Sequence, residues 1–181
     1  NFSGVFLYEY DYKNKARVEK MLTDYVSKGG KVFVDTGSEV KESDTTNTFE
    51  FFPVNETKRK DFGTSWDFKA GESEFTKGVN FSEFSPPIFD ESPWKVSYSD
   101  EVNEGANVLL ENKGKVVLAS NRLGDGLVFW SGLNLPYHVI RYNNADEVIF
   151  FQKIFEKIIE KRDVQTRPSN ISRVSAQRLL I

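Results

Sequence analysis

The sequence contains one histidine and no cysteine, so its means of nucleophilic catalysis are few. The lack of a thiol excludes Cys-dependent mechanisms and thiolate metal sites, and one imidazole cannot build a multi-histidine metal site. A serine hydrolase would have to use His138 as its base, with Ser131 as a candidate nucleophile. Ser131 lies in Trp-Ser-Gly rather than in a Gly-x-Ser-x-Gly elbow. We therefore favour a structural histidine that makes hydrogen bonds.

A second group of polar residues comes directly after an apolar run that is typical of a buried strand. Asp35 and Ser38 lie where such a strand ends, and Asn134 and His138 follow the last predicted strand. Ligands of open α/β sheets bind beyond the carboxyl ends of parallel strands. We therefore predict a ligand-binding set of Asp35, Ser38, Asn134 and His138. The alternative for Asp35 to Ser38 is a capping turn, which we favour because Asp, Gly and Ser are common turn formers.

The remaining motifs predict neither a metal nor a cofactor. Asp100, Glu101, Asn103 and Glu104 could hold Ca²⁺, but without EF-hand spacing we interpret them as a solvated acidic loop. Neither a P-loop nor a strand followed by Gly-x-Gly-x-x-Gly occurs, so nucleotide binding has no support. A carboxylate pair for glycoside hydrolysis stays open, since 27 acidic residues can meet in many ways.

Aromatic residues are concentrated between residues 38 and 93, in a segment that charges, glycines and prolines interrupt. Disordered linkers are poor in aromatic residues, so we expect an ordered excursion whose rings pack on the core. Trp66, Trp94 and Trp130 could instead stack on sugar rings. Trp130 lies in mid-strand, which favours a place in the core.

Two regular patterns frame this excursion. Residues 2–10 and Lys31–Asp35 read as buried strands, and residues 13–28 between them have a helical apolar stripe that Gly29-Gly30 ends. Such a βαβ unit makes a parallel pair. Residues 94–132 predict an antiparallel meander with turns near residues 112–114 and 124–126, followed by a helix over residues 144–161.

These elements predict a flavodoxin-like, three-layer α/β sandwich whose sheet is mainly parallel, with an antiparallel meander near its C-terminus. We expect the domain to span residues 1–162, with residues 163–181 forming a linker or the start of the next domain. The net charge of −3 argues against nucleic-acid binding. No run approaches the roughly 18 apolar residues that a membrane span requires.

The two ends of the chain and the Asn-x-Ser/Thr sequons suggest where the protein comes from and where it is located. The chain begins without Met and stops inside the apolar run Leu179–Ile181, so we expect both ends to be cuts from a longer protein. Sequons at Asn1, Asn55, Asn80 and Asn170 exceed the roughly two expected by chance, a slight sign of a location outside the cytoplasm.

Two blocks of the sequence carry a family resemblance. VEKMLTDYVSKGGKVFVDTG, residues 18–37, resembles the helix, double glycine and strand of the class I glutamine amidotransferase-like superfamily, which includes ThuA-like and β-galactosidase trimerisation domains. NRLGDGLVFWSGLNLPYH, residues 121–138, is similar to a late Gly-x-Gly turn and strand of the same superfamily. With the terminal helix, the resemblance covers about half of the chain.

The resemblance implies a degenerate member, because active amidotransferases use a Cys nucleophile with a His and a Glu near the C-terminus. His138 lies in Pro-Tyr-His rather than in His-Pro-Glu, so glutamine hydrolysis by that route is excluded. The arrangement most resembles degenerate domains of large polytopic prokaryotic membrane proteins, some of them described as related to 6-pyruvoyl-tetrahydropterin synthase. That synthase chemistry needs a zinc-binding histidine cluster, which one histidine cannot supply.

Three functions follow as alternatives. The first is a non-catalytic, extracytoplasmic domain of a membrane protein, which interacts with other domains of that protein or binds a polar ligand such as a glycan or an envelope component. The second is a hydrolase that uses carboxylates or Ser131 and His138. The third is a structural module for oligomerisation.

Overall fold

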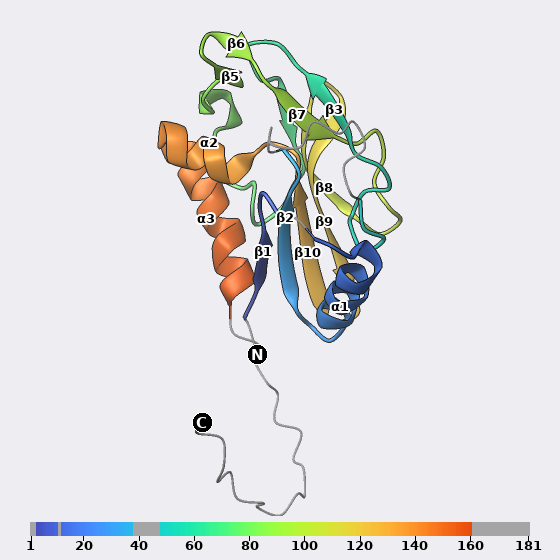
Figure 1. Ribbon diagram of the computed structural model, residues 1–181. Helices are drawn as coiled ribbons and strands as arrows, with labels where there is room; N and C mark the ends of the chain where they lie inside the picture. The colour runs from blue at the N-terminus through green and yellow to red at the C-terminus, as the bar shows by residue number, and fades with distance from the viewer. Residues whose placement is uncertain (1–2, 11, 38–47, 161–181) are drawn as a thin grey trace, which may run out of the picture.

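A six-stranded mixed sheet forms the centre of the protein (Figure 1). The computed structural model describes residues 3–10, 12–37 and 48–160. In spatial order the strands of the sheet are β1 (Val5–Leu7), β2 (Lys31–Asp35), β10 (Gly126–Ser131), β9 (Lys115–Leu123), β8 (Asn107–Asn112) and β4 (Phe68–Ala70). The helices are α1 (Lys15–Ser27), α2 (Leu135–Tyr142) and α3 (Ala145–Ile159).

The expected flavodoxin-like, mainly parallel sheet is wrong. Among the strands of the described residues, only β1 with β2 and β2 with β10 are parallel, whereas β10 with β9, β9 with β8 and β8 with β4 are antiparallel. The turns explain the difference. Lys113 and Gly114 both adopt positive φ between β8 and β9, as a tight two-residue hairpin turn requires. Parallel neighbours need a long crossover, which α1 supplies between β1 and β2.

The predicted βαβ unit is confirmed within this mixed sheet. The predicted meander is confirmed over residues 107–131 but is wrong at its start, because β7 (Lys95–Tyr98) pairs with β3 (Lys58–Asp61) in a separate small sheet. β1, α1 and β2 form the parallel unit, and β8, β9 and β10 follow one another antiparallel. The side chain of Asn14 accepts a hydrogen bond from the Arg17 amide and so caps the start of α1. Gly29, with φ of 87°, lies just beyond its end.

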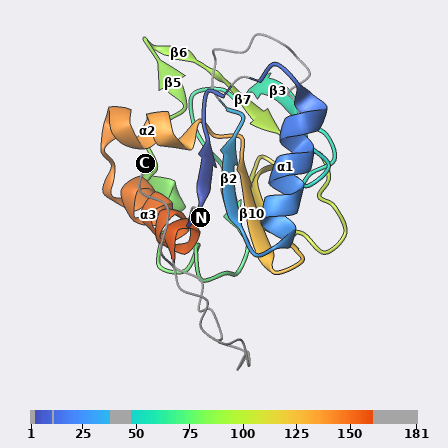
Figure 2. The same cartoon turned by 60° about the horizontal axis from the view of Figure 1, so that its bottom comes forward.

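Helices cover both faces of the sheet, α1 on one side and α2 with α3 on the other (Figure 2). Successive strand residues point to opposite faces. Val32 and Val34 of β2 therefore pack in the cluster beneath α1, whereas Phe33 packs in the cluster beneath α3. Phe150 and Ile154 of α3 are fully buried in the latter cluster. Each such side chain contributes about 1.5–3 kcal/mol of burial free energy.

The aromatic segment contributes its rings to the core, and three of its strands take part in two small sheets beside it. These pairs are β3 (Lys58–Asp61) with β7 (Lys95–Tyr98), and β5 (Ile88–Phe89) with β6 (Ser92–Pro93). A 3₁₀ turn, η1 (Phe81–Glu83), packs against α3. Phe49, Phe52, Phe75 and Phe84 are buried in the clusters of the main sheet.

Two expectations fall on parts of the chain that are not described. Residues 163–181, the expected linker, lie outside the described residues, as do Ser38 and the rest of residues 38–47. In the described part, none of the helices combines the length and the apolar character that a bilayer crossing would need.

Candidate functional site

The carboxylate of Asp35 lies at the C-terminal end of β2 and holds the start of α2. Its Oδ1 accepts hydrogen bonds from the amides of Gly37, at 2.7 Å, and Asn134, at 3.1 Å. Its Oδ2 accepts one from the amide of Leu135, at 2.9 Å. The first amides of a helix have no partner inside the helix. Asp35 therefore acts as a cap supplied from a neighbouring strand, and this is the capping role that its turn residues suggested.

Burial is the main influence on the pKa of Asp35. Because the side chain is fully enclosed, desolvation raises the pKa of Asp35 from 3.8 to about 6. Hydrogen bonds from the Ser131 hydroxyl and from the Leu135, Gly37 and Asn134 amides act in the opposite direction and offset part of this rise.

Asn134 joins the ends of three strands. It adopts the left-handed conformation, with φ of 53° and ψ of 41°, which Asn tolerates better than most residues. Its Oδ1 accepts a hydrogen bond of 2.9 Å from the hydroxyl of Tyr8, which follows β1. Gly37 packs so closely here that a Cβ atom would lie 2.1 Å from the Asn134 nitrogen. The structure thus brings Asp35 and Asn134, two members of the predicted ligand-binding set, together and buries both.

His138 belongs to a different cluster, between α2 and α3. Its Nδ1 lies 2.7 Å from Oε1 of Glu147, and the side chains of His138 and Glu147 are 3% and 0% exposed. The same Oε1 accepts a hydrogen bond of 2.7 Å from the amide of Ser85. Among the described residues, neither Nε2 of His138 nor Oε2 of Glu147 has a hydrogen-bond partner.

Aromatic rings enclose the imidazole of His138. The centroid of the imidazole lies 4.8 Å from the ring centroid of Tyr142, 5.2 Å from that of Trp94 and 6.1 Å from that of Trp66. The side chain therefore has protein on all these sides and little access to solvent.

The arrangement does not assemble a serine-histidine relay. The Ser131 hydroxyl interacts with Asp35 and accepts a hydrogen bond of 3.2 Å from the amide of Leu133. Nδ1 of His138 is engaged by Glu147, and Nε2 has no partner among the described residues. A nucleophile has to lie within hydrogen-bond reach of its base, and the described contacts place Ser131 and His138 in separate clusters.

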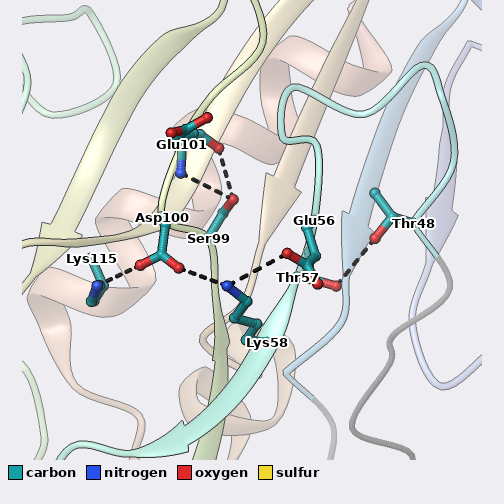
Figure 3. Close-up of polar contacts among 8 residues, drawn as sticks. All are labelled: Thr48, Glu56, Thr57, Lys58, Ser99, Asp100, Glu101 and Lys115. Carbon is teal, nitrogen blue, oxygen red and sulfur yellow. Dashed lines mark hydrogen bonds and ion pairs between the residues drawn. The ribbon is translucent and has the colours of Figure 1, made fainter.

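Asp100 of the acidic loop pairs with two lysines. Asp100 lies between Lys58, at 2.9 Å, and Lys115 (Figure 3). These contacts lower the pKa of Asp100, the hydrogen bond from Lys115 having the largest effect. Ser99 closes the loop by donating to the carbonyl of Glu101 at 2.7 Å. In the described ranges, no cluster of three or more acidic or histidine side chains is arranged to hold a metal ion.

The three tryptophans have different environments. Trp130 is fully buried and donates to the Thr36 hydroxyl at 3.0 Å, and Trp94 is also buried. Trp66 is only half buried and lines a groove of about 270 Å³. The other residues that line this groove are Ser65, Asp67, Phe68, Phe81, Ser82, Phe84 and Pro86. We call it the Trp66 groove.

A chain of hydrogen bonds links the Trp66 groove to His138. The indole nitrogen of Trp66 donates to the carbonyl of Ser85 at 2.7 Å. The amide of Ser85 donates to Glu147, which pairs with His138. His138 is thus connected to the groove through Glu147 and Ser85, and does not line it.

Glu147 is the residue that sequence reasoning missed. It occupies the first position of the α3 stripe that continues with Phe150, Ile154 and Ile158, all buried. An acidic residue in register with a helix's apolar stripe is a readable signal, since buried carboxylates need a partner.

Comparisons with known proteins give distant structural similarities. No family model matches the chain, and no curated protein matches it. A cytoplasmic protein from Salmonella typhimurium LT2 is similar over 73% of this chain and 60% of its own, at 19% identity and a TM-score of 0.45. A second Salmonella typhimurium cytoplasmic protein is similar over 68% of this chain and 51% of its own, at 15% identity and a TM-score of 0.38.

The third similar structure is an exo-β-1,4-mannosidase from Opitutaceae bacterium strain TAV5, over 80% of this chain, at 13% identity and a TM-score of 0.40. The chain spans 60%, 51% and 23% of the lengths of these three proteins. Its own geometry is therefore the basis for a functional assignment.

Proposed function

We propose that this chain is a non-catalytic domain that binds a polar ligand, with glycans as the ligand class. The observation that carries the proposal is that the side chains with catalytic potential are occupied by structural contacts. Asp35 caps α2, Ser131 bonds to Asp35, and His138 pairs with Glu147. Groups that turn over a substrate need contact with it, and these four side chains are buried.

The family resemblance is consistent with the same proposal. A degenerate amidotransferase-like domain without cysteine has lost the nucleophile of that superfamily. What such a domain retains is a rigid scaffold and a surface, and these are sufficient for binding.

We also propose that the domain belongs to a membrane protein and lies outside the cytoplasm, where other domains of that protein and envelope components would be its partners. The resemblance supports this location, and the sequons at Asn55 and Asn80 have exposed side chains. The cysteine-free chain offers a direct test with Met21→Cys, because Met21 is 60% exposed. Labelling of the parent protein by an impermeant maleimide in intact cells supports this location. Labelling only after lysis overturns it.

Binding can be tested on a panel of immobilised glycans and envelope polysaccharides. We expect saturable retention of the folded domain on at least one of them. Ser131→Ala should bind the glycan as well as the wild type does, because Ser131 is buried and does not contribute to the protein surface. Absence of binding to every member of the panel would overturn the proposal.

A further inference from the structure

The Trp66 groove is a surface feature that combines aromatic rings with polar side chains. Trp66 and Phe68 are half buried and stack with their ring centroids 4.9 Å apart. Ser65, Asp67 and Ser82 are exposed beside these rings. The groove therefore has an aromatic floor and a rim of two hydroxyls and one carboxylate.

We propose that the Trp66 groove is the binding subsite for one pyranose ring. The inference rests on the proposed glycan-binding function and names its location. A sugar ring presents apolar C–H groups on its faces and hydroxyls around its edge. Aromatic rings pack against the C–H faces, and hydroxyl and carboxylate oxygens form hydrogen bonds with the sugar hydroxyls. The volume of about 270 Å³ is near the lower end of small-molecule pockets, as a single ring requires.

The charges around the groove favour a neutral ligand over an anion. Among the described residues that line it there is no Lys, Arg or His, and Asp67 is acidic. Phosphate or sulfate groups would meet the Asp67 carboxylate without a compensating cation. An organic ammonium is the competing ligand class, because aromatic faces and a carboxylate also attract cations, and the test below includes it.

The wall of the groove that carries Trp66 and Asp67 is held in place by buried partners. The indole N–H of Trp66 is used by the Ser85 carbonyl, so the ring is fixed in orientation. The amide of Asp67 donates to Oδ1 of Asn112, a fully buried side chain, at 2.8 Å.

The opposite wall, which carries Ser82 and Phe84, is attached to α3. The amide of Asn80 donates to Asp146 at 2.9 Å, and the side-chain amide of Asn144 donates to the carbonyl of Glu83 at 2.7 Å. Both walls are thus formed before a ligand arrives, which lowers the ordering cost of binding.

His138 acts in this site as a positioning residue. Its imidazole packs edge-on against the ring of Trp66. Through Glu147 and Ser85 it also determines where the carbonyl that holds Trp66 lies. Its contribution to binding is therefore indirect.

The three tryptophans give the test a simple readout. In ¹H–¹⁵N spectra the protein has three indole N–H signals, and Trp66→Phe identifies the one that belongs to Trp66. The two remaining signals report whether that variant is folded. On titration with methyl pyranosides we expect the Trp66 signal to shift while those of Trp94 and Trp130 stay in place.

Matched variants locate the binding energy. Asp67→Ala should weaken pyranoside binding about tenfold, as expected for loss of a charged acceptor. Asp125→Ala, an exposed acidic residue in the turn between β9 and β10, should bind as the wild type does.

The other outcomes of the titration refute the subsite, the ligand class or the proposed function separately. A pyranoside that binds without shifting the Trp66 signal, or equally well to Asp67→Ala, refutes the subsite but leaves the proposed function standing. Tetramethylammonium that shifts the Trp66 signal where pyranosides do not refutes the ligand class. Failure of every glycan to bind anywhere on the protein refutes the proposed function as well.

Discussion

Nδ1 of His138 and Oε1 of Glu147 lie 2.7 Å apart, and this contact joins α2 to α3 in the protein interior. Each residue alone would be an unfavourable buried polar group. Nδ1 and Oε1 satisfy one another, and the same Oε1 also accepts a hydrogen bond from the amide of Ser85. The pair therefore unites two helices and the segment that holds the Trp66 groove.

Removal of one member of this pair should destabilise the fold. His138→Ala leaves the Glu147 carboxylate buried without its imidazole partner, and we expect the free energy of unfolding to fall by about 3–5 kcal/mol. Urea denaturation followed by tryptophan fluorescence measures this change. The double variant His138→Leu/Glu147→Leu should recover part of the loss, because it removes both polar groups. A loss below about 1 kcal/mol in His138→Ala would contradict a structural role for the pair.

The hydrogen bonds from Glu147 through Ser85 to Trp66 should slow hydrogen exchange at both Ser85 and Trp66. Glu147→Leu removes the acceptor of the Ser85 amide, so the Ser85 amide and the Trp66 indole should exchange with solvent faster. Hydrogen exchange followed by NMR measures both groups. The indole of Trp130, which donates to Thr36, is the internal control and should exchange as before. Unchanged exchange at Ser85 and Trp66 would show that the hydrogen bonds through Glu147 do not fix the position of Trp66 in the groove.

Asp35 should give stability a measurable pH dependence. Its pKa is about 6 in the folded protein and 3.8 when unperturbed, so between these values the folded state binds more protons than the unfolded state. The contribution of Asp35 to the unfolding free energy therefore falls as pH rises from about 4 to 6, by about 3 kcal/mol in total. Denaturation at a series of pH values should show this slope in the wild type, relative to Asp35→Asn. Parallel pH profiles for the two proteins would contradict the raised pKa.

Gly37 should tolerate no side chain. A Cβ atom there would lie 2.1 Å from the Asn134 nitrogen and 2.4 Å from the Gly132 oxygen, both of them backbone atoms. We expect Gly37→Ala to cost more than about 3 kcal/mol, because the two loops would have to separate. Gly78→Ala is the matched control, with a φ of 75° but open space around it, and should cost only about 1–2 kcal/mol. Equal losses in a thermal or urea unfolding experiment would refute the close packing at Gly37.

Local pattern predicted the βαβ unit, the hairpins of β8, β9 and β10, and α3, but not the short strands of residues 38–93 or the order of the whole sheet. The apolar stripe and Gly29 located α1, and the turns near residues 113 and 124 located the meander, because these signals are short-range. The pairing of β10 with β2 joins segments about 95 residues apart, and no local pattern encodes its neighbour or its direction. α2 was missed because it is only eight residues long and begins with an unusual left-handed Asn134.

The candidate site was predictable to a similar extent. Asp35 and Asn134, two members of the predicted ligand-binding set, lie together across a separation of 99 residues, because Asp35 ends β2 and Asn134 follows β10, its parallel neighbour. Their role as buried capping groups depends on α2, which the pattern did not reveal. The Trp66 groove arises where residues 65–68, at the start of β4, approach residues 81–86, which include η1, and such contacts leave no periodic signal.

The central claim is that the domain binds a glycan and leaves it unchanged, and one NMR sample tests both parts. The domain is mixed with a bound glycan at near-equal concentration, and the ligand's signals are followed for many hours. The account predicts ligand lines broadened by binding and no product signals, in the wild type and in Ser131→Ala alike. New anomeric or ester-cleavage signals that disappear in Ser131→Ala or His138→Ala would contradict it and identify the domain as a hydrolase.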